Sequence, residues 1–81
     1  MHERHLADDL VADLLDHARR HGIRRIRTVT VRLGPLCEIQ AAVLRHVIED
    51  HAGGTPLEGA QLKVEEGTLR EVRLVGYEGE P

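Results

Sequence analysis

The sequence predicts an α+β domain in which two helices pack on one face of a small three-stranded mixed or antiparallel sheet. Three observations support this. Two segments carry apolar residues at helical spacing, other segments are alternating and β-branched, and glycine or proline separates several of them. The predicted order is helix, strand, helix, strand, strand. The 81 residues, 41% hydrophobic and 31% charged, fit a single folded domain over residues 1–81.

The first helix is expected over residues 3–21. Its apolar side chains form one stripe, which consists of Leu6, Ala7, Leu10, Val11, Leu14, Leu15 and Ala18. Acidic residues come early in this segment and basic residues late, as the helix dipole favours. Gly22 follows and is suited to the left-handed conformation that often ends a helix.

A strand is expected over residues 23–33, because Val29, Val31 and Leu33 alternate with polar residues. Gly34-Pro35 ends it, and a second helix is predicted over residues 38–51. The buried stripe of that helix comprises Ala41, Val43, Leu44, Val47 and Ile48.

The segment Gly53–Pro56 is the clearest break in the chain and ends the second helix. Residues 62–65 then alternate as a short strand, and residues 69–77 are expected to form another strand. A turn at Glu66-Gly67 predicts that these two strands form a hairpin. Residues 78–81 are expected to be irregular.

Composition excludes several classes of protein. Cys37 is the single cysteine, so neither a disulfide framework nor a cysteine-based zinc or iron–sulfur site fits within these residues. No apolar run approaches the roughly 20 residues of a membrane span. A net charge of −3 argues against a dedicated nucleic-acid binder. The charged N-terminus resembles no secretory signal, which predicts a cytoplasmic protein.

The core must be built almost entirely from aliphatic side chains, since Tyr77 is the sole aromatic residue. A domain of this size buries only roughly 60% of its unfolded surface, so its own core leaves little spare stability. A second copy of the chain would add buried surface, which makes a homodimer an option.

His2 and Glu3 stand at the N-terminus, where a histidine can offer its imidazole while the Met1 amine and the first backbone nitrogens complete chelate rings. Nitrogen donors arranged in a plane suit Ni(II) or Cu(II) better than zinc. The alternative is a frayed, solvated terminus, which is the commoner role of such residues.

The other histidines give weaker signals. His17 and His21 are four residues apart and share a helix face, and Asp13 lies one turn earlier. This geometry is compatible with a metal, but basic side chains are expected at a helix end, and that structural interpretation is preferred. His5 is one turn from His2 and is interpreted as surface or as an occasional neighbour of the metal. His46 and His51 predict no site.

The remaining candidates point away from an enzyme. Cys37 precedes a helix, where a thiolate is favoured, but no histidine is placed as its base, so a small, partly buried residue is the preferred interpretation. No nucleophile elbow, phosphate-binding glycine loop or carboxylate pair occurs. The basic segment of residues 19–27 could be a solvated face paired with acids of the first helix, a site for an acidic protein or, least favoured, a nucleic-acid contact.

Four segments in order resemble the HypA family of nickel-insertion accessory proteins in hydrogenase maturation. They are Met1-His2-Glu3, Ala18-Arg19-Arg20-His21-Gly22, Val31-Arg32-Leu33-Gly34-Pro35-Leu36 and Gly54-Thr55-Pro56-Leu57-Glu58-Gly59-Ala60-Gln61-Leu62. The resemblance implies that His2 holds Ni(II) together with the Met1 amine and backbone nitrogens, and that Glu3 positions or tunes the metal. It also implies delivery of nickel to a hydrogenase large subunit with a HypB-like GTPase.

Two departures from the family pattern stand out. Family members carry a zinc-binding insert with two CxxC pairs between the last two strands, whereas residues 63–70 here lead directly into the closing strand. No zinc site is therefore expected. An acidic residue usual near the nickel site is replaced by Gln40, a candidate neighbour of the metal. These departures leave open an alternative function, a protein–protein interaction module that has lost metal transfer.

Overall fold

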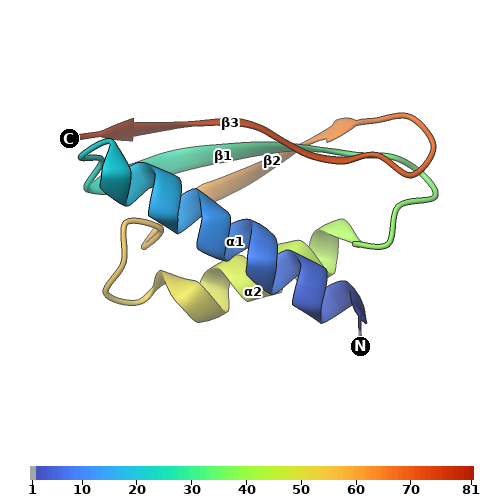
Figure 1. The fold of residues 1–81 in the computed structure, drawn as a ribbon, viewed down its shortest axis with the longest axis horizontal. Coiled ribbons are helices and arrows are strands. Elements are labelled where there is room, and N and C mark those ends of the chain that lie inside the picture. Colours follow the sequence, from blue (N-terminus) through green and yellow to red (C-terminus); the bar gives the residue numbers. More distant parts are fainter. Residues whose placement is uncertain (1) are drawn as a thin grey trace.

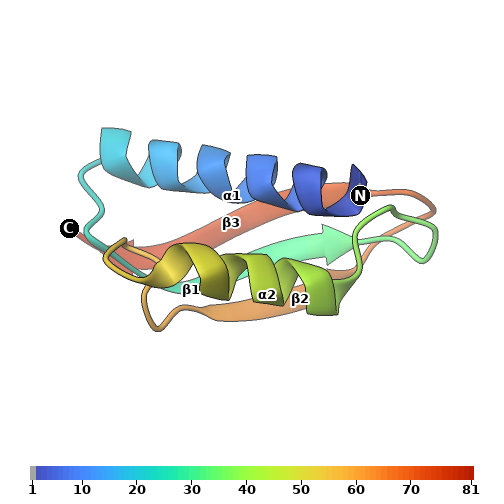
Figure 2. The same cartoon turned by 90° about the horizontal axis from the view of Figure 1, so that it is seen from below.

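The chain folds into two layers, in which a pair of helices lies side by side across one face of a three-stranded sheet (Figures 1 and 2). The computed structural model describes the backbone of residues 2–81 and the side chains of residues 5–81. The elements are α1 (His2–Arg20), β1 (Arg25–Leu33), α2 (Ala41–Ala52), β2 (Gln61–Glu66) and β3 (Val72–Glu80). The predicted fold class and order of elements are confirmed.

The strand order is β2-β1-β3, with β1 parallel to β2 and antiparallel to β3. The predicted hairpin between the last two strands is therefore wrong, because both pair with β1 and lie on opposite edges of the sheet. The chain passes through α2 before it enters β2, and a helical connection of this kind allows β2 to run parallel to β1. Residues 67–71 then cross the end of β1, so β3 returns along the other edge.

Backbone hydrogen bonds hold this crossing in place. The amide of Gly67 donates to the carbonyl of Leu33 at 2.9 Å, and the amide of Gly34 donates to the carbonyl of Glu71 at 2.8 Å. The crossing segment is thus attached to the end of β1 on both sides. Sequence periodicity cannot reveal such an attachment, because it depends on backbone groups alone.

The end of the chain is more regular than predicted. Residues 78–80 belong to β3, where Gly79 lies opposite Ile26 and Glu80 opposite Arg25. The amide of Arg24 also donates to the carbonyl of Glu80 at 2.8 Å. The start of β1 needs these partners, and its backbone therefore orders a glycine- and glutamate-rich segment that has no apolar alternation of its own.

The core lies between the sheet and the helices. Helix α1 buries Ala7, Val11, Leu14 and Ala18 of its predicted stripe, whereas Leu6 is 41% exposed. Helix α2 begins three residues later than expected, with Ile39 already buried ahead of it. The buried residues are Ala7, Val11, Leu14, Ala18, Ile26, Val29, Val31, Leu33, Ile39, Leu44, Val47, Ile48 and Leu57. None of the helices in the described part of the chain combines the length and apolar character that a bilayer span requires.

Candidate metal centre

The predicted nickel ligands lie at the start of α1. The backbone of His2 and Glu3 belongs to the first turn of this helix. Met1 and the side chains of His2 and Glu3 lie outside the described part of the structure. The first four amides of an α-helix have no intrahelical acceptor, so the amide nitrogens of His2 and Glu3 are not needed for the helix hydrogen-bond ladder.

The starts of α1 and α2 lie at the same end of the molecule (Figures 1 and 2). Gln40 is the N-cap residue of α2, has extended backbone angles (φ −86°, ψ 146°) and does not cap the helix with its side chain. It is exposed, as is His5 on α1. The fold thus places Gln40 at the end of the molecule where the predicted ligands begin, and both helix dipoles direct partial positive charge there.

Among the described side chains, no group of three or more histidine, cysteine, aspartate or glutamate residues could hold a metal ion. Cys37 is half-buried, and its thiol donates to the carbonyl oxygen of Ile39 at 2.9 Å. This contact fits the structural interpretation of Cys37 rather than a reactive thiolate.

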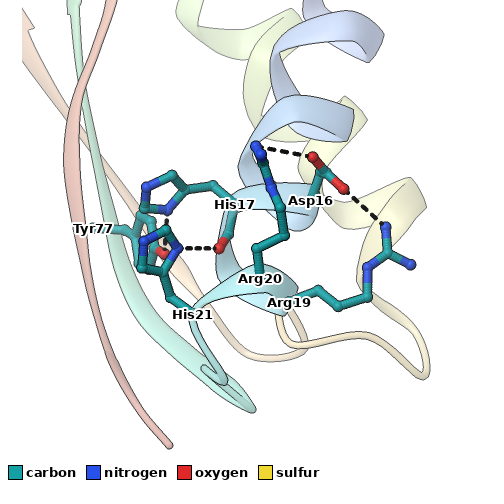
Figure 3. A network of polar contacts seen from close by, with 6 residues as sticks. All are labelled: Asp16, His17, Arg19, Arg20, His21 and Tyr77. Atoms are coloured by element: carbon teal, nitrogen blue, oxygen red, sulfur yellow. Dashed lines mark hydrogen bonds and ion pairs between the residues drawn. The ribbon is translucent and has the colours of Figure 1, made fainter.

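His17 and His21 form a small cluster with Tyr77 at the other end of α1 (Figure 3). The two imidazole rings stack with their centroids 4.1 Å apart and their planes 20° apart. Nδ1 of His17 lies 2.7 Å from the hydroxyl of Tyr77, which reaches it from β3. The helix spacing predicted the histidine pair, but nothing in the sequence indicated its aromatic partner.

The charges of the basic segment, residues 19–27, are partly neutralised by ion pairs. Arg19 and Arg20 both contact Asp16, at 3.4 Å and 3.1 Å, and Arg27 contacts Glu80 at 3.2 Å. The Asp16 contacts agree with the interpretation of a solvated face paired with acids of the first helix. All of these side chains are largely exposed, so each ion pair contributes at most about 1 kcal/mol.

A second contact that the sequence did not predict joins α1 and α2. Nε2 of His51, near the end of α2, lies 3.2 Å from a carboxylate oxygen of Asp8 on α1. Both side chains are about two-fifths exposed, at 41% and 38%. The pair therefore links two adjacent helices at the surface and does not form a buried site.

Comparison with known proteins identifies relatives of the chain. Residues 1–72 match the family model described as hydrogenase/urease nickel incorporation, metallochaperone, hypA. The hydrogenase maturation factor HypA of Thermococcus kodakarensis is 38% identical over 79 residues, which are 96% of this chain and 57% of that protein. HypA of Chloroflexus aurantiacus is 41% identical over 66 residues, 82% of this chain and 58% of that protein. The chain thus spans about half the length of the curated relatives it matches.

The fold also has a solved counterpart. The solution structure of the nickel metallochaperone HypA from Helicobacter pylori aligns with a TM-score of 0.63 at 15% identity, over 91% of this chain and 70% of that one. Identity at that level supports the fold alone. The family match and the curated relatives carry the assignment further: the chain belongs to the HypA family of nickel-incorporation metallochaperones.

Proposed function

We propose that the chain binds Ni(II) with its N-terminal residues and delivers it during maturation of a [NiFe]-hydrogenase, acting as a metallochaperone and not as an enzyme. The observation that carries the proposal is the Met1-His2-Glu3 start, which lies within the residues matched by the nickel-incorporation family. The protein is proposed to act in the cytoplasm.

The proposed donors are the imidazole of His2, the amine of Met1 and the backbone nitrogens of residues 2 and 3. Ni(II) accepts such a planar nitrogen set, whereas zinc prefers a tetrahedral one. The amides required lie in the first turn of α1, where the helix has no acceptor for them. Their deprotonation therefore sacrifices no helical hydrogen bond.

Glu3 is proposed as a weak ligand or as a carboxylate that positions the complex. Gln40 and His5 are proposed as its neighbours, Gln40 from the start of α2 and His5 from the second turn of α1. The shared end of the two helices supports this arrangement for Gln40. A neutral amide at position 40 compensates the metal charge less than a carboxylate would, so we expect weaker nickel affinity than with an acid there.

The proposed partners are a HypB-like GTPase and the hydrogenase large subunit. No zinc site is proposed within these residues, since Cys37 is their single cysteine. A second candidate, an interaction module without metal transfer, follows from the same fact, because relatives with a cysteine-bound zinc lobe have an element that this sequence does not contain.

The test uses untagged protein with Met1 as the first residue. Equilibrium dialysis with Ni(II) should show tight binding of one ion, which His2→Ala abolishes and His46→Ala, an exposed histidine on α2, leaves intact. Pull-down with HypB and the large subunit, with and without Ni(II), then separates the two candidates. Equal partner binding by His2→Ala, with no nickel transfer by the parent protein, would support the interaction module instead.

A further inference from the structure

We propose that a groove between the C-terminal parts of α1 and α2 binds an acidic segment of a partner protein that also carries aliphatic side chains. The groove has a volume of about 930 Å³ and extends from α1 to the loop after α2. Both lie at the end of the molecule that holds the C-terminus, away from the start of α1 (Figure 2). A partner bound there leaves the start of α1 uncovered, so the proposal does not depend on the N-terminal nickel site.

Half-buried apolar side chains line the groove. Leu15 and Ile23 pack against the core, and Pro56 contributes from the loop after α2. This loop is attached to β1, because the amide of Ile26 donates to the carbonyl of Pro56 at 2.8 Å. The groove is thus formed in the free protein, as most binding pockets are, and offers a fixed apolar surface to an aliphatic side chain.

Two cations beside this apolar lining have no acidic partner in the described structure. Arg24 lines the groove, and Arg25 joins it in an adjoining hollow of about 240 Å³. Both are exposed, and neither forms an ion pair within residues 5–81. The other three arginines of residues 19–27 are paired with acids of this chain. The structure therefore divides the basic segment and leaves Arg24 and Arg25 to meet an outside charge.

These two guanidinium groups favour an acidic partner. A guanidinium donates hydrogen bonds in one plane to a carboxylate, often two at once, which suits arginine to the recognition of aspartate or glutamate. Glu58 lines both hollows as well, but among the described residues no ion pair joins it to Arg24 or Arg25. It lowers the positive potential of the groove without cancelling two positive charges.

Charge alone would not hold such a segment, since exposed ion pairs contribute little. Aliphatic side chains of the partner must also be buried against Leu15, Ile23 and Pro56. Carboxylates and aliphatic side chains occur together in peptides and not in nucleic acids. A net charge of −3 also disfavours a nucleic acid, and Tyr77, the sole aromatic residue on which a base could stack, does not line the groove.

The test presents short immobilised peptides to the purified full chain. One set places aspartate or glutamate beside leucine, isoleucine or valine. A second set replaces the acids by glutamine, and a third replaces the aliphatic residues by serine. The proposal predicts that the chain binds members of the first set alone. Fluorescence anisotropy then measures the affinity of the strongest binder, which should fall as the salt concentration rises.

Substitutions locate the bound peptide on the surface. Arg24→Glu combined with Arg25→Glu should weaken binding of the strongest peptide at least tenfold, because the reversed charges repel its carboxylates. Ala12→Glu, at an exposed position of α1 that lines the groove, should weaken it too. Arg45→Glu combined with Arg70→Glu is the matched control, since these exposed arginines lie outside the groove and the net charge changes equally. This control should bind like the parent protein.

Circular dichroism of each variant checks that the fold survives, as expected for exposed side chains. The proposal is overturned if no peptide of the first set binds, or if Arg24→Glu with Arg25→Glu leaves the affinity unchanged. Equal losses in the two double variants would reveal a non-specific charge effect and would overturn it as well. Tighter binding of single-stranded RNA, lost on Arg24→Glu with Arg25→Glu, would assign the groove to nucleic acid instead. None of these results depends on whether His2 binds nickel.

Discussion

The carbonyl oxygen of Leu69 lies so close to the backbone of Gly34 that a β-carbon on residue 34 would be 2.2 Å from it. The carbonyl oxygen of Thr68 would be 2.6 Å away. This is the point at which residues 67–71 cross the end of β1. The close approach permits the order β2-β1-β3, since any side chain at position 34 would push the crossing segment away from the strand.

Gly34→Ala should lower the free energy of unfolding by about 1–3 kcal/mol or more, because backbone atoms cannot give way as a flexible side chain can. Urea denaturation followed by far-ultraviolet circular dichroism measures this. Gly53→Ala is the matched control, since its β-carbon would meet nothing within 4 Å and its φ is −58°. Equal stability of the Gly34→Ala and parent proteins would contradict the crossing as described.

Leu69 adopts a left-handed backbone conformation, with φ of 49°, and is 69% exposed. This conformation costs most L-residues roughly 1–2 kcal/mol, and asparagine tolerates it better. Leu69→Asn should therefore raise the free energy of unfolding by about 0.5–1 kcal/mol in the same urea measurement. Leu36→Asn, at a similarly exposed leucine (58%) without a positive φ, should bring no such gain. A gain of the same size in both would assign the effect to exposed apolar surface.

The hydroxyl group of Thr55 makes hydrogen bonds at the C-terminal end of α2. The hydroxyl contacts the carbonyl oxygens of His51 and Ala52, at 2.9 Å and 2.8 Å, and accepts from the amide of Leu57 at 3.2 Å. Leu57 is fully buried. Thr55→Val keeps the shape but removes these bonds and should cost about 1–2 kcal/mol of stability in thermal unfolding. Thr55→Ser keeps the hydroxyl and should lose much less; an equal loss would point to the methyl group.

Two substitutions of Gln40 can distinguish an effect on helix capping from an effect on metal binding. Aspartate and serine are both better N-caps than glutamine, so Gln40→Asp and Gln40→Ser should each stabilise the metal-free protein by up to about 1 kcal/mol. Only aspartate adds negative charge. If residue 40 lies near the ion, Gln40→Asp alone should tighten Ni(II) binding in calorimetric titration. Equal affinities of the two variants would remove residue 40 from the neighbourhood of the metal.

The helices and the central strand could be predicted because their apolar residues repeat with the period of the element. On α1 the buried residues of the predicted stripe are Ala7, Val11, Leu14 and Ala18, while Leu6 is exposed; the alternating Val29, Val31 and Leu33 of β1 all point into the core. Strand pairing could not be predicted in the same way. The position of β2 and the extension of β3 to Glu80 depend on backbone hydrogen bonds to β1, to which side-chain patterns are insensitive.

The candidate sites show the same contrast between local sequence pattern and long-range packing. His2 and Glu3 could be singled out because a metal complex at the chain terminus uses neighbouring residues, and the family resemblance extends over them. The pairs His17–Tyr77 and Asp8–His51 join residues 60 and 43 positions apart, and only the packing of α1 against β3 and α2 brings them together. The spacing of His17 and His21 revealed the pair but not the contacts that orient it.

The most direct test of the nickel-site proposal is the absorption spectrum of Ni(II)-loaded protein that begins at Met1, recorded beside His2→Ala and beside a variant with one alanine added before Met1. A planar complex of four nitrogen donors is diamagnetic and has a visible ligand-field band. The proposal predicts that band and one bound ion in the parent protein, and their loss in both variants. An identical nickel spectrum in all three proteins would show that the ion binds elsewhere and would contradict the N-terminal site.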